Sequence, residues 1–423
     1  MHQKFLKSIN TALFIVLLLM IACFFTWSEN VNITRAIKVV GRLGVLLGTI
    51  FIYRKIIRYG AVNSIQYKEV LPNIFYLAYL FLGLISFAWS TNIGVSALQW
   101  FMTFQSFVFA YFFIKSIKIL DIFFPEHPIK FYRLLGNSAF VLQLIFVIGM
   151  FVNPDIFFRL TNGGTEARLG GTIMNPNELG MLAGVGIACL IFELYDSKNR
   201  KFTIFKILVI AYALFMTGSR SSLIGVLLIV FFHINQTKKK TLKLGIIGLV
   251  LAVAPFAVFQ IILKGGDPER MEEILSLTGR LPFWKALITE GLPREPFFGF
   301  GFMRIDYNEF FRSVHTYPGK MTHNTFIQVL MNLGFVGLLI VIFQVLFTVR
   351  AILQENKQNK LMLLGILIPI TINSFTEFGI FGENNYGILF YQTIIFYTAF
   401  QNSKYYTATQ RNFLHRKRPD FAI

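Results

Sequence analysis

The sequence predicts an all-α integral membrane protein with about twelve transmembrane helices and one large outward loop that forms a partly helical cap. Hydrophobic residues make up 55% of the 423 residues and charged residues only 14%, whereas a soluble domain carries about 25% charged residues. Most of the surface must therefore face lipid. The net charge of +19 could suggest a nucleic-acid partner, but the charges follow membrane topology instead, so no nucleic acid is expected.

Twelve apolar segments approach the length of about twenty residues that a helix needs to cross the bilayer core. The first follows Lys4 and Lys7 and resembles a signal peptide. It lacks a small-residue cleavage site, so we interpret it as a retained span. The twelve predicted spans lie near 11–27, 36–53, 72–90, 95–114, 134–153, 176–195, 203–217, 221–235, 243–263, 324–349, 361–378 and 386–402.

The distribution of lysine and arginine predicts that both termini are cytoplasmic. With the N-terminus inside, the cytoplasmic loops hold 26 of the 40 lysines and arginines, as the positive-inside rule requires. Eight more lie in the long outer loop 264–323, where the rule hardly applies, and the short outer segments hold six. The basic run 416–418 predicts an anchor to anionic membrane lipids.

The outer loop 264–323 is the one sizeable segment that we expect outside the membrane. Residues 267–288 have helical spacing, with Met271, Ile274 and Leu275 among the apolar side chains and acidic residues near the start. An amphipathic helix of this kind would lie over the membrane as a cap. We therefore expect three parts: the first five spans (1–167), a core that includes the loop (168–349), and two last spans with a basic tail (350–423).

Several polar residues at the outward ends of spans are candidates for a binding site. Asn175 can cap a helix that begins at Pro176, leaving backbone N–H groups that could hold an anion beside Arg168. Arg220 follows Ser219 in a short outward turn. It could simply reach the membrane interface, but its position defies the positive-inside bias, which favours a function.

Two further candidates lie in the outer loop or at its end. Arg280, with Trp284 one turn later, has a planar guanidinium that suits a diphosphate, although a loop arginine is more often only solvated. His323 and Asn324 stand where the loop enters the tenth span. Such a histidine usually caps a helix or lies at the interface, yet His323 is the side chain best suited to accept a proton near neutral pH.

Cofactor and metal motifs are missing from the sequence. It contains no nucleotide-binding glycine loop, no HExxH motif, no EF-hand loop and no Asp-x-Asp pair. The six histidines are scattered, and the two cysteines, Cys23 and Cys189, lie in separate apolar segments. We therefore expect no cofactor and no metal centre.

The candidate residues resemble those of the O-antigen ligase and polymerase superfamily of bacterial envelope glycan transferases. His323-Asn324, nine residues, then Gly334-Phe-Val-Gly337 is similar to the ligase signature. The other positions that resemble the family are Arg168, Asn175, Asn177, Ser219, Arg220, Arg280 and Trp284.

The resemblance implies metal-independent, inverting transfer of a glycan from undecaprenyl diphosphate to an acceptor hydroxyl at the periplasmic face of the inner membrane. Arg220 and Arg280, then Arg168, would stabilise the diphosphate, and His323 would accept or orient the hydroxyl proton. The signature favours an O-antigen ligase of lipopolysaccharide biosynthesis, with lipid A-core as acceptor.

Alternatives remain open at this point. Ten residues separate Arg159 from Gly170 and Arg280 from Gly291, a spacing similar to that of the polymerases that extend O-antigen, capsule or exopolysaccharide. A protein O-oligosaccharyltransferase would be another member of this class. Outside it, twelve spans also suit a transporter or flippase, but such a carrier should show ionisable residues in mid-span.

Overall fold

The computed structural model describes residues 2–58, 65–161, 166–236, 280–303 and 322–400, with positions 244 and 248. It is mostly helical, and six helical segments of the described chain are long and apolar enough to cross a membrane. These six confirm a multi-span helical protein, whereas the full set of twelve spans stays a prediction. The six segments are Gln3–Ala22, Val31–Arg58, Leu71–Ala88, Phe131–Val152, Pro176–Leu194 and Thr325–Leu353.

The described helices fall on eleven of the predicted spans, and 243–263 lies almost wholly outside the described residues. Several boundaries differ from the predicted ones: α1 ends at Ala22 and not near residue 27, and α5 continues to Phe123 beyond residue 114. The predicted span 361–378 is a helix that ends at Ser374, which leaves Glu377 in a loop. The helices are α1 (His2–Ala22), α2 (Val31–Ala36), α3 (Arg42–Arg58), α4 (Leu71–Ile85), α5 (Ile93–Phe123), α6 (Phe131–Val152), α7 (Pro154–Phe157), α8 (Pro176–Leu194), α9 (Arg200–Thr217), α10 (Arg220–Gln236), α13 (Arg280–Ala286), α15 (Thr325–Leu353), α16 (Lys357–Ser374) and α17 (Tyr386–Ala399).

Short irregular elements interrupt the helices. Two π-helical turns, η1 (Ile37–Gly41) and η6 (Leu287–Gly291), continue α2 into α3 and extend α13, and a 3-10 turn, η2 (Ser86–Ala88), ends α4. An antiparallel hairpin joins β1 (Phe158–Thr161) to β2 (Glu166–Leu169). The all-α prediction therefore missed two short strands, which carry no period-2 apolar pattern long enough to reveal them.

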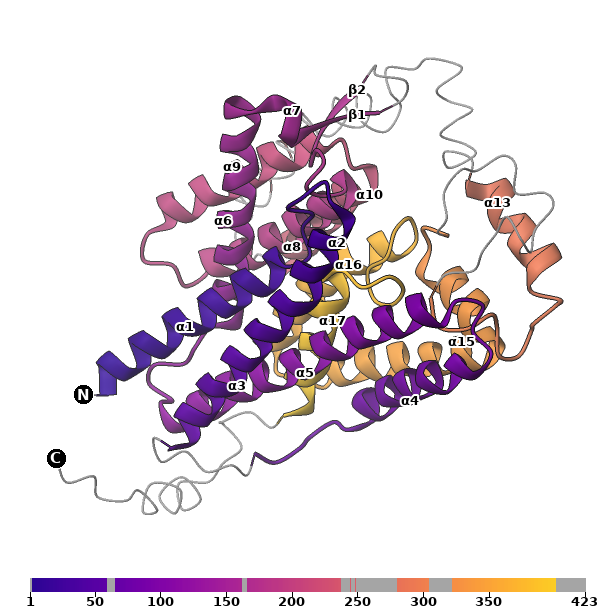
Figure 1. Cartoon of the computed structure of the whole chain (residues 1–423). Helices are drawn as coiled ribbons and strands as arrows, with labels where there is room; N and C mark the ends of the chain where they lie inside the picture. Colours follow the sequence, from indigo (N-terminus) through magenta and orange to yellow (C-terminus); the bar gives the residue numbers. More distant parts are fainter. Residues whose placement is uncertain are drawn as a thin grey trace.

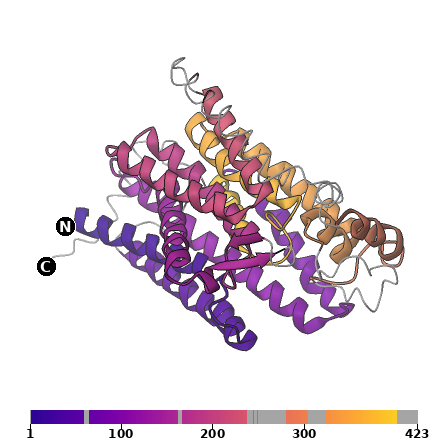
Figure 2. The ribbon, with the colours of Figure 1, turned by 90° about the horizontal axis from the view of Figure 1, so that it is seen from above.

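Helix α8 lies at the centre of the bundle and packs against α6, α9, α10 and α16 (Figures 1 and 2). Its glycines permit these close approaches, because a Cβ at Gly184 would lie 3.0 Å from the Cβ of Pro369 and one at Gly186 would lie 2.8 Å from the Cβ of Ala139. Small residues at helix contacts are typical of membrane proteins. Helices from both ends of the chain also pack together, α4 with α15 and α5 with α17.

Helix α15 is broken at Gly334, the first glycine of the predicted signature. Its backbone has φ +63°, and a Cβ there would lie 2.2 Å from the carbonyl carbon of Phe297. The chain from the outer loop fills this break, since the N–H groups of Phe335 and Gly301 donate across it to the carbonyls of Pro296 and Asn332. Glycine is needed here because other residues are strained at this φ.

The outer loop is described only in part. Residues 280–291 are helical, in agreement with the end of the predicted cap helix, and residues 264–279 lie outside the described residues. Phe283 and Leu287 are buried in a small cluster with Phe300 and with Met331 of α15. This part of the cap is therefore packed against the start of α15 (Figure 1).

Candidate active site

Glu377, in the loop between α16 and α17, is the centre of a polar cluster that we call the Glu377 centre. Its Oε2 lies 2.7 Å from Nδ1 of His323, and its Oε1 accepts hydrogen bonds from Nη2 of Arg280 at 3.0 Å and from Nδ2 of Asn177 at 2.7 Å. Burial by itself would raise the pKa of this carboxyl, but His323, Arg280 and Asn177 together lower it to about 2. Glu377 is therefore a carboxylate throughout the physiological pH range.

His323 is held in an unusual backbone conformation, with φ +50°. Asn324 follows it and caps α15, where its Oδ1 accepts from the N–H groups of Phe326 and Ile327 at 2.9 and 3.1 Å. A carboxylate can only accept, so Nδ1 of a neutral His323 must carry the proton that it shares with Glu377. In that tautomer Nε2 is the basic nitrogen, which suits His323 for accepting a proton.

Arg280 begins α13 and joins the outer loop to the Glu377 centre. Its Nη1 donates to the carbonyl of Thr376, and its buried Nε has no hydrogen-bond acceptor among the described residues. Trp284, one turn later, donates from Nε1 to the carbonyl of Thr322 at 2.6 Å. The predicted pair Arg280 and Trp284 therefore holds both the Glu377 loop and the residue before His323.

Arg168, on β2, reaches the same cluster through Asn177. Its Nη2 donates to Oδ1 of Asn177 and its Nε to the carbonyl of Thr217, both at 2.7 Å. Asn177 thus bridges Arg168 and Glu377, while Asn175 accepts from the Asn177 N–H at 2.9 Å and caps α8 as predicted. Burial, with the nearby charge of Arg220, lowers the pKa of the Arg168 guanidinium from its ordinary value.

Ser219 and Arg220 form the predicted tight turn between α9 and α10. Gly218 has φ +59° at the end of α9, a conformation that favours glycine, and a Cβ there would lie 3.3 Å from Nε of Arg168. Ser219 donates to Oγ of Ser222 at 2.9 Å, and half-buried Arg220 is the first residue of α10. The turn therefore brings Arg220 to the Arg168 side of the centre.

Sequence reasoning predicted nine residues here but missed Glu377, to which it assigned no role. The structure brings three of the nine, His323, Arg280 and Asn177, directly to this carboxylate. The available signal was that an acidic residue stood within an apolar segment, where charge is expensive. Among the described residues no group of three or more histidines, cysteines or carboxylates could hold a metal ion.

Comparison with known families gives this cluster a context. Residues 204–342 match a family model described as O-antigen ligase. The chain carries an O-antigen ligase family domain. The matched range covers about a third of the chain and includes Arg220, Arg280 and His323. No curated protein matches the chain.

The O-antigen ligase family match agrees with the expectation drawn from the His-Asn signature. The match and the long apolar helices indicate a multi-pass membrane protein with a glycosyltransferase domain of the O-antigen ligase family over residues 204–342. Arg168, Asn177 and Glu377 lie outside the matched range, yet they complete the cluster around the residues inside it. The residues inside the matched range and those outside it therefore form one cluster at the same end of the bundle.

Proposed function

We propose that this O-antigen ligase family protein transfers a glycan from undecaprenyl diphosphate to a hydroxyl of lipid A-core, with inversion and without a metal ion. The supporting observation is that His323, Arg280 and Asn177 converge on Glu377, with Arg168 bound to Asn177. A proton acceptor and several guanidinium groups thus stand together at one end of the helices. These are the groups that such a transfer needs.

The arginines would stabilise the leaving diphosphate. As the glycosidic bond breaks, the diphosphate gains negative charge, and fixed cations in a partly dehydrated site stabilise that charge. Arg168, Arg220 and Arg280 supply three guanidinium groups around the carboxylate of Glu377. Arg280 also has a buried Nε–H without an acceptor among the described residues, which a phosphate oxygen could accept.

His323 would accept the proton of the attacking hydroxyl, and Glu377 would act as its positioning residue. The 2.7 Å contact from Oε2 of Glu377 to Nδ1 of His323 orients the ring and stabilises the imidazolium that forms. The hydroxyl oxygen then attacks the anomeric carbon from the face opposite the diphosphate, which gives inversion.

We further propose twelve spans with cytoplasmic termini, which puts the Glu377 centre at the periplasmic face. The supporting observation is that α8, α10 and α15 all begin at the end of the bundle that holds this centre. Reporter fusions at Lys240 and after residue 410 should score cytoplasmic, and fusions at Gly266 and Lys320 periplasmic. A cytoplasmic signal at Lys320 would contradict this orientation.

Replacement of His323 tests the proposed reaction. A strain with His323→Ala should accumulate full-length glycan on undecaprenyl diphosphate and leave lipid A-core unmodified, as measured by mass spectrometry of both lipid fractions. The matched control is His127→Ala, because His127 is an exposed histidine between α5 and α6, at the other end of the bundle. This control should keep wild-type glycan.

Two other outcomes would contradict the proposal in different ways. Lipid A-core that carries a single repeat unit would identify a polymerase, because a separate ligase would still deliver unpolymerised units. Wild-type glycan in the His323→Ala strain, with normal protein level, would reject a catalytic role for this histidine.

A further inference from the structure

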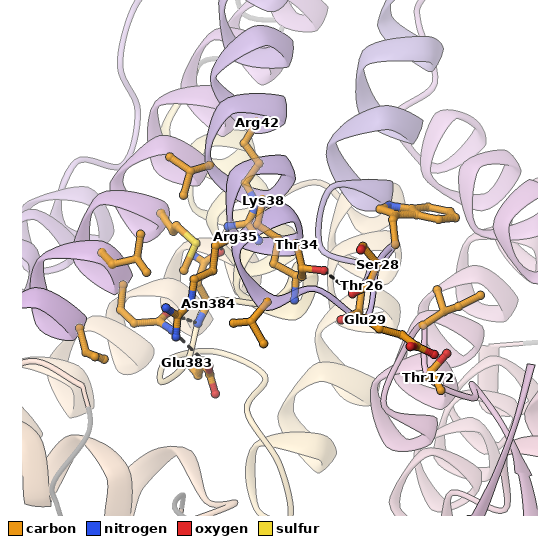
Figure 3. A pocket seen from close by; sticks show the side chains of 18 of the residues that line it. Thr26, Ser28, Glu29, Thr34, Arg35, Lys38, Arg42, Thr172, Glu383 and Asn384 are labelled. Carbon is orange, nitrogen blue, oxygen red and sulfur yellow. Dashed lines mark hydrogen bonds between the residues drawn. The ribbon is translucent and has the colours of Figure 1, made fainter. Parts of the chain in front are cut away.

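A cavity of about 670 Å³ opens beside the second predicted span and is lined by none of the residues of the Glu377 centre (Figure 3). Its walls come from residues 26–29, 156–157 and 172–173, from the helix that runs through α2, η1 and α3, from the start of α5, and from Glu383 and Asn384. Pockets that hold small ligands usually measure about 300–1,000 Å³. The cavity is therefore large enough for a lipid head group.

Three cationic residues line this cavity along one side of the second span. Arg35, Lys38 and Arg42 are three and four residues apart, a spacing that places side chains on one helix face, and Figure 3 shows them one after another along the same helix. Two carboxylates, Glu29 and Glu383, also line the cavity, and Glu383 accepts a hydrogen bond from Gln99 at 3.1 Å. The cations outnumber the carboxylates, so the cavity favours an anion.

Arg42 is a deeply buried cation in the lining of the cavity. Its side chain is 1% exposed, its guanidinium carbon lies 3.8 Å from the ring centre of Phe24, and Nη1 donates to Asn384. Its Nε–H is buried with no acceptor among the described residues. A buried donor without an acceptor is unfavourable, and an anionic group in the cavity would satisfy it.

The helix itself is irregular at this point. Lys38 lies in the π-helical turn η1, and such turns occur often at functional sites. Lysine and arginine within a membrane span are also unfavourable unless they serve a function. Both observations are independent of the cavity, and both point to the residues that line it.

The first turn of α8 connects the cavity to the Glu377 centre electrostatically. Asn177 hydrogen-bonds to Glu377, and the next residue, Glu178, interacts electrostatically with Glu377, Lys38 and Glu383. Lys38 is therefore within electrostatic reach of the residue that follows Asn177.

We propose that this cavity binds a phosphate group on the head of the membrane-anchored acceptor, with Lys38 and Arg42 as its principal contacts. The assignment to the acceptor rests on the proposed function, in which Arg168, Arg220 and Arg280 already take the diphosphate of the donor. The cavity also offers the hydroxyl groups of Thr26 and Thr34 and the aromatic ring of Trp27 to the sugars of such a head group.

Binding measurements on the purified full-length protein test the assignment without using glycan transfer. Lipid A, which carries phosphate, and undecaprenyl diphosphate serve as the two probes, and native mass spectrometry or thermophoresis gives both Kd values. In Lys38→Gln and Arg42→Gln, binding of lipid A should weaken roughly tenfold or more, the effect of losing a charge-assisted contact, while the Kd for undecaprenyl diphosphate stays within about twofold.

The controls separate the two subsites. Arg280→Gln should show the reverse pattern, and Arg54→Gln, which removes an exposed cation from the other end of the same helix, should change neither affinity. Lys38 is only half-buried, so Lys38→Gln should fold even if Arg42→Gln does not. Because no outcome depends on catalysis, failure of this proposal is distinct from a negative result with His323→Ala.

Three results would overturn the proposal. The first is unchanged binding of lipid A in both variants, and the second is no binding of lipid A by the wild-type protein. The third is a loss of undecaprenyl diphosphate binding that equals or exceeds the loss of lipid A binding, which would assign the cavity to the donor.

Discussion

The Glu377 centre and the cavity beside α3 both contain cationic side chains close to helix ends, but they differ in what surrounds the charge. In the Glu377 centre a buried carboxylate accepts from Arg280 and Asn177 and contacts His323, and Asn177 joins Arg168 to it. In the cavity, Lys38 and Arg42 line about 670 Å³ of open space. The first arrangement holds reactive groups in position, and the second leaves room for a ligand.

Among the substitutions considered, Glu377→Gln should reduce the rate of glycan transfer most, and it tests whether the Glu377 centre acts in catalysis and not in acceptor binding. Glutamine nearly preserves the shape but removes the charge that orients His323 and stabilises its imidazolium, so kcat should fall by about a hundredfold or more. Transfer kinetics with purified donor and acceptor would measure it, with little change in the acceptor KM. Glu383→Gln, in the same loop but on the cavity, should instead alter mainly the acceptor KM.

The pH dependence of folding provides a second readout for Glu377→Gln. The pKa of Glu377 in the folded protein, about 2, lies below its ordinary value of 4.5, so the ionised carboxylate stabilises the fold above pH 4.5. That contribution declines as the pH falls from 4.5 toward 2. The Tm of Glu377→Gln should therefore depend less on pH in this window than that of the wild type, and equal slopes would contradict the ionic network.

Gly334→Ala should destabilise the break in α15, the helix that begins beside His323, and should leave the cavity unchanged. The added Cβ would meet the carbonyl of Phe297 at a positive φ, so we expect a loss of roughly 2–4 kcal/mol in stability. Thermal unfolding in detergent would measure the change. Gly48→Ala is the matched control, because its Cβ would have only Val16 nearby, at 4.0 Å.

Lysine substitutions of the arginines should give a smaller effect. If Arg220 and Arg280 contact the diphosphate through two N–H groups each, Arg→Lys should lose roughly 1.5–3 kcal/mol of transition-state stabilisation although it keeps the charge. The ratio kcat/KM for the donor reports this loss. Arg294→Lys, at an exposed position of the same loop as Arg280, is the control. Full activity of both Arg220→Lys and Arg280→Lys would contradict a role for these arginines in stabilising the diphosphate.

Removal of divalent metal ions should have no effect. The sequence offers no acidic pair or histidine cluster with metal-ligand spacing, so the purified protein should transfer glycan at an unchanged rate in excess EDTA. If EDTA abolishes activity and Mg²⁺ or Mn²⁺ restores it, a metal ion and not the arginines stabilises the leaving diphosphate, which would contradict the proposed function.

Much of the candidate site was predictable because its residues carry local signals. Asn175 and Asn324 precede helices that they cap, and Gly334 and Gly337 stand at a defined distance from His323. The turn at Ser219 and Arg220 was visible as the sole break between two apolar runs. In contrast, α16 ends at Ser374 although the apolar run continues to Phe378, so hydropathy alone placed Glu377 inside a span.

The sequence by itself determined which segments enter the membrane, because the transfer free energy of a segment depends on its own composition. It also singled out Arg168, Arg220 and Arg280 as candidates for binding an anion. Only the tertiary structure decided their partners. Asn177 and Glu377 are 200 residues apart, and their contact depends on how α8 and α16 pack, a property of two surfaces together that neither segment carries alone.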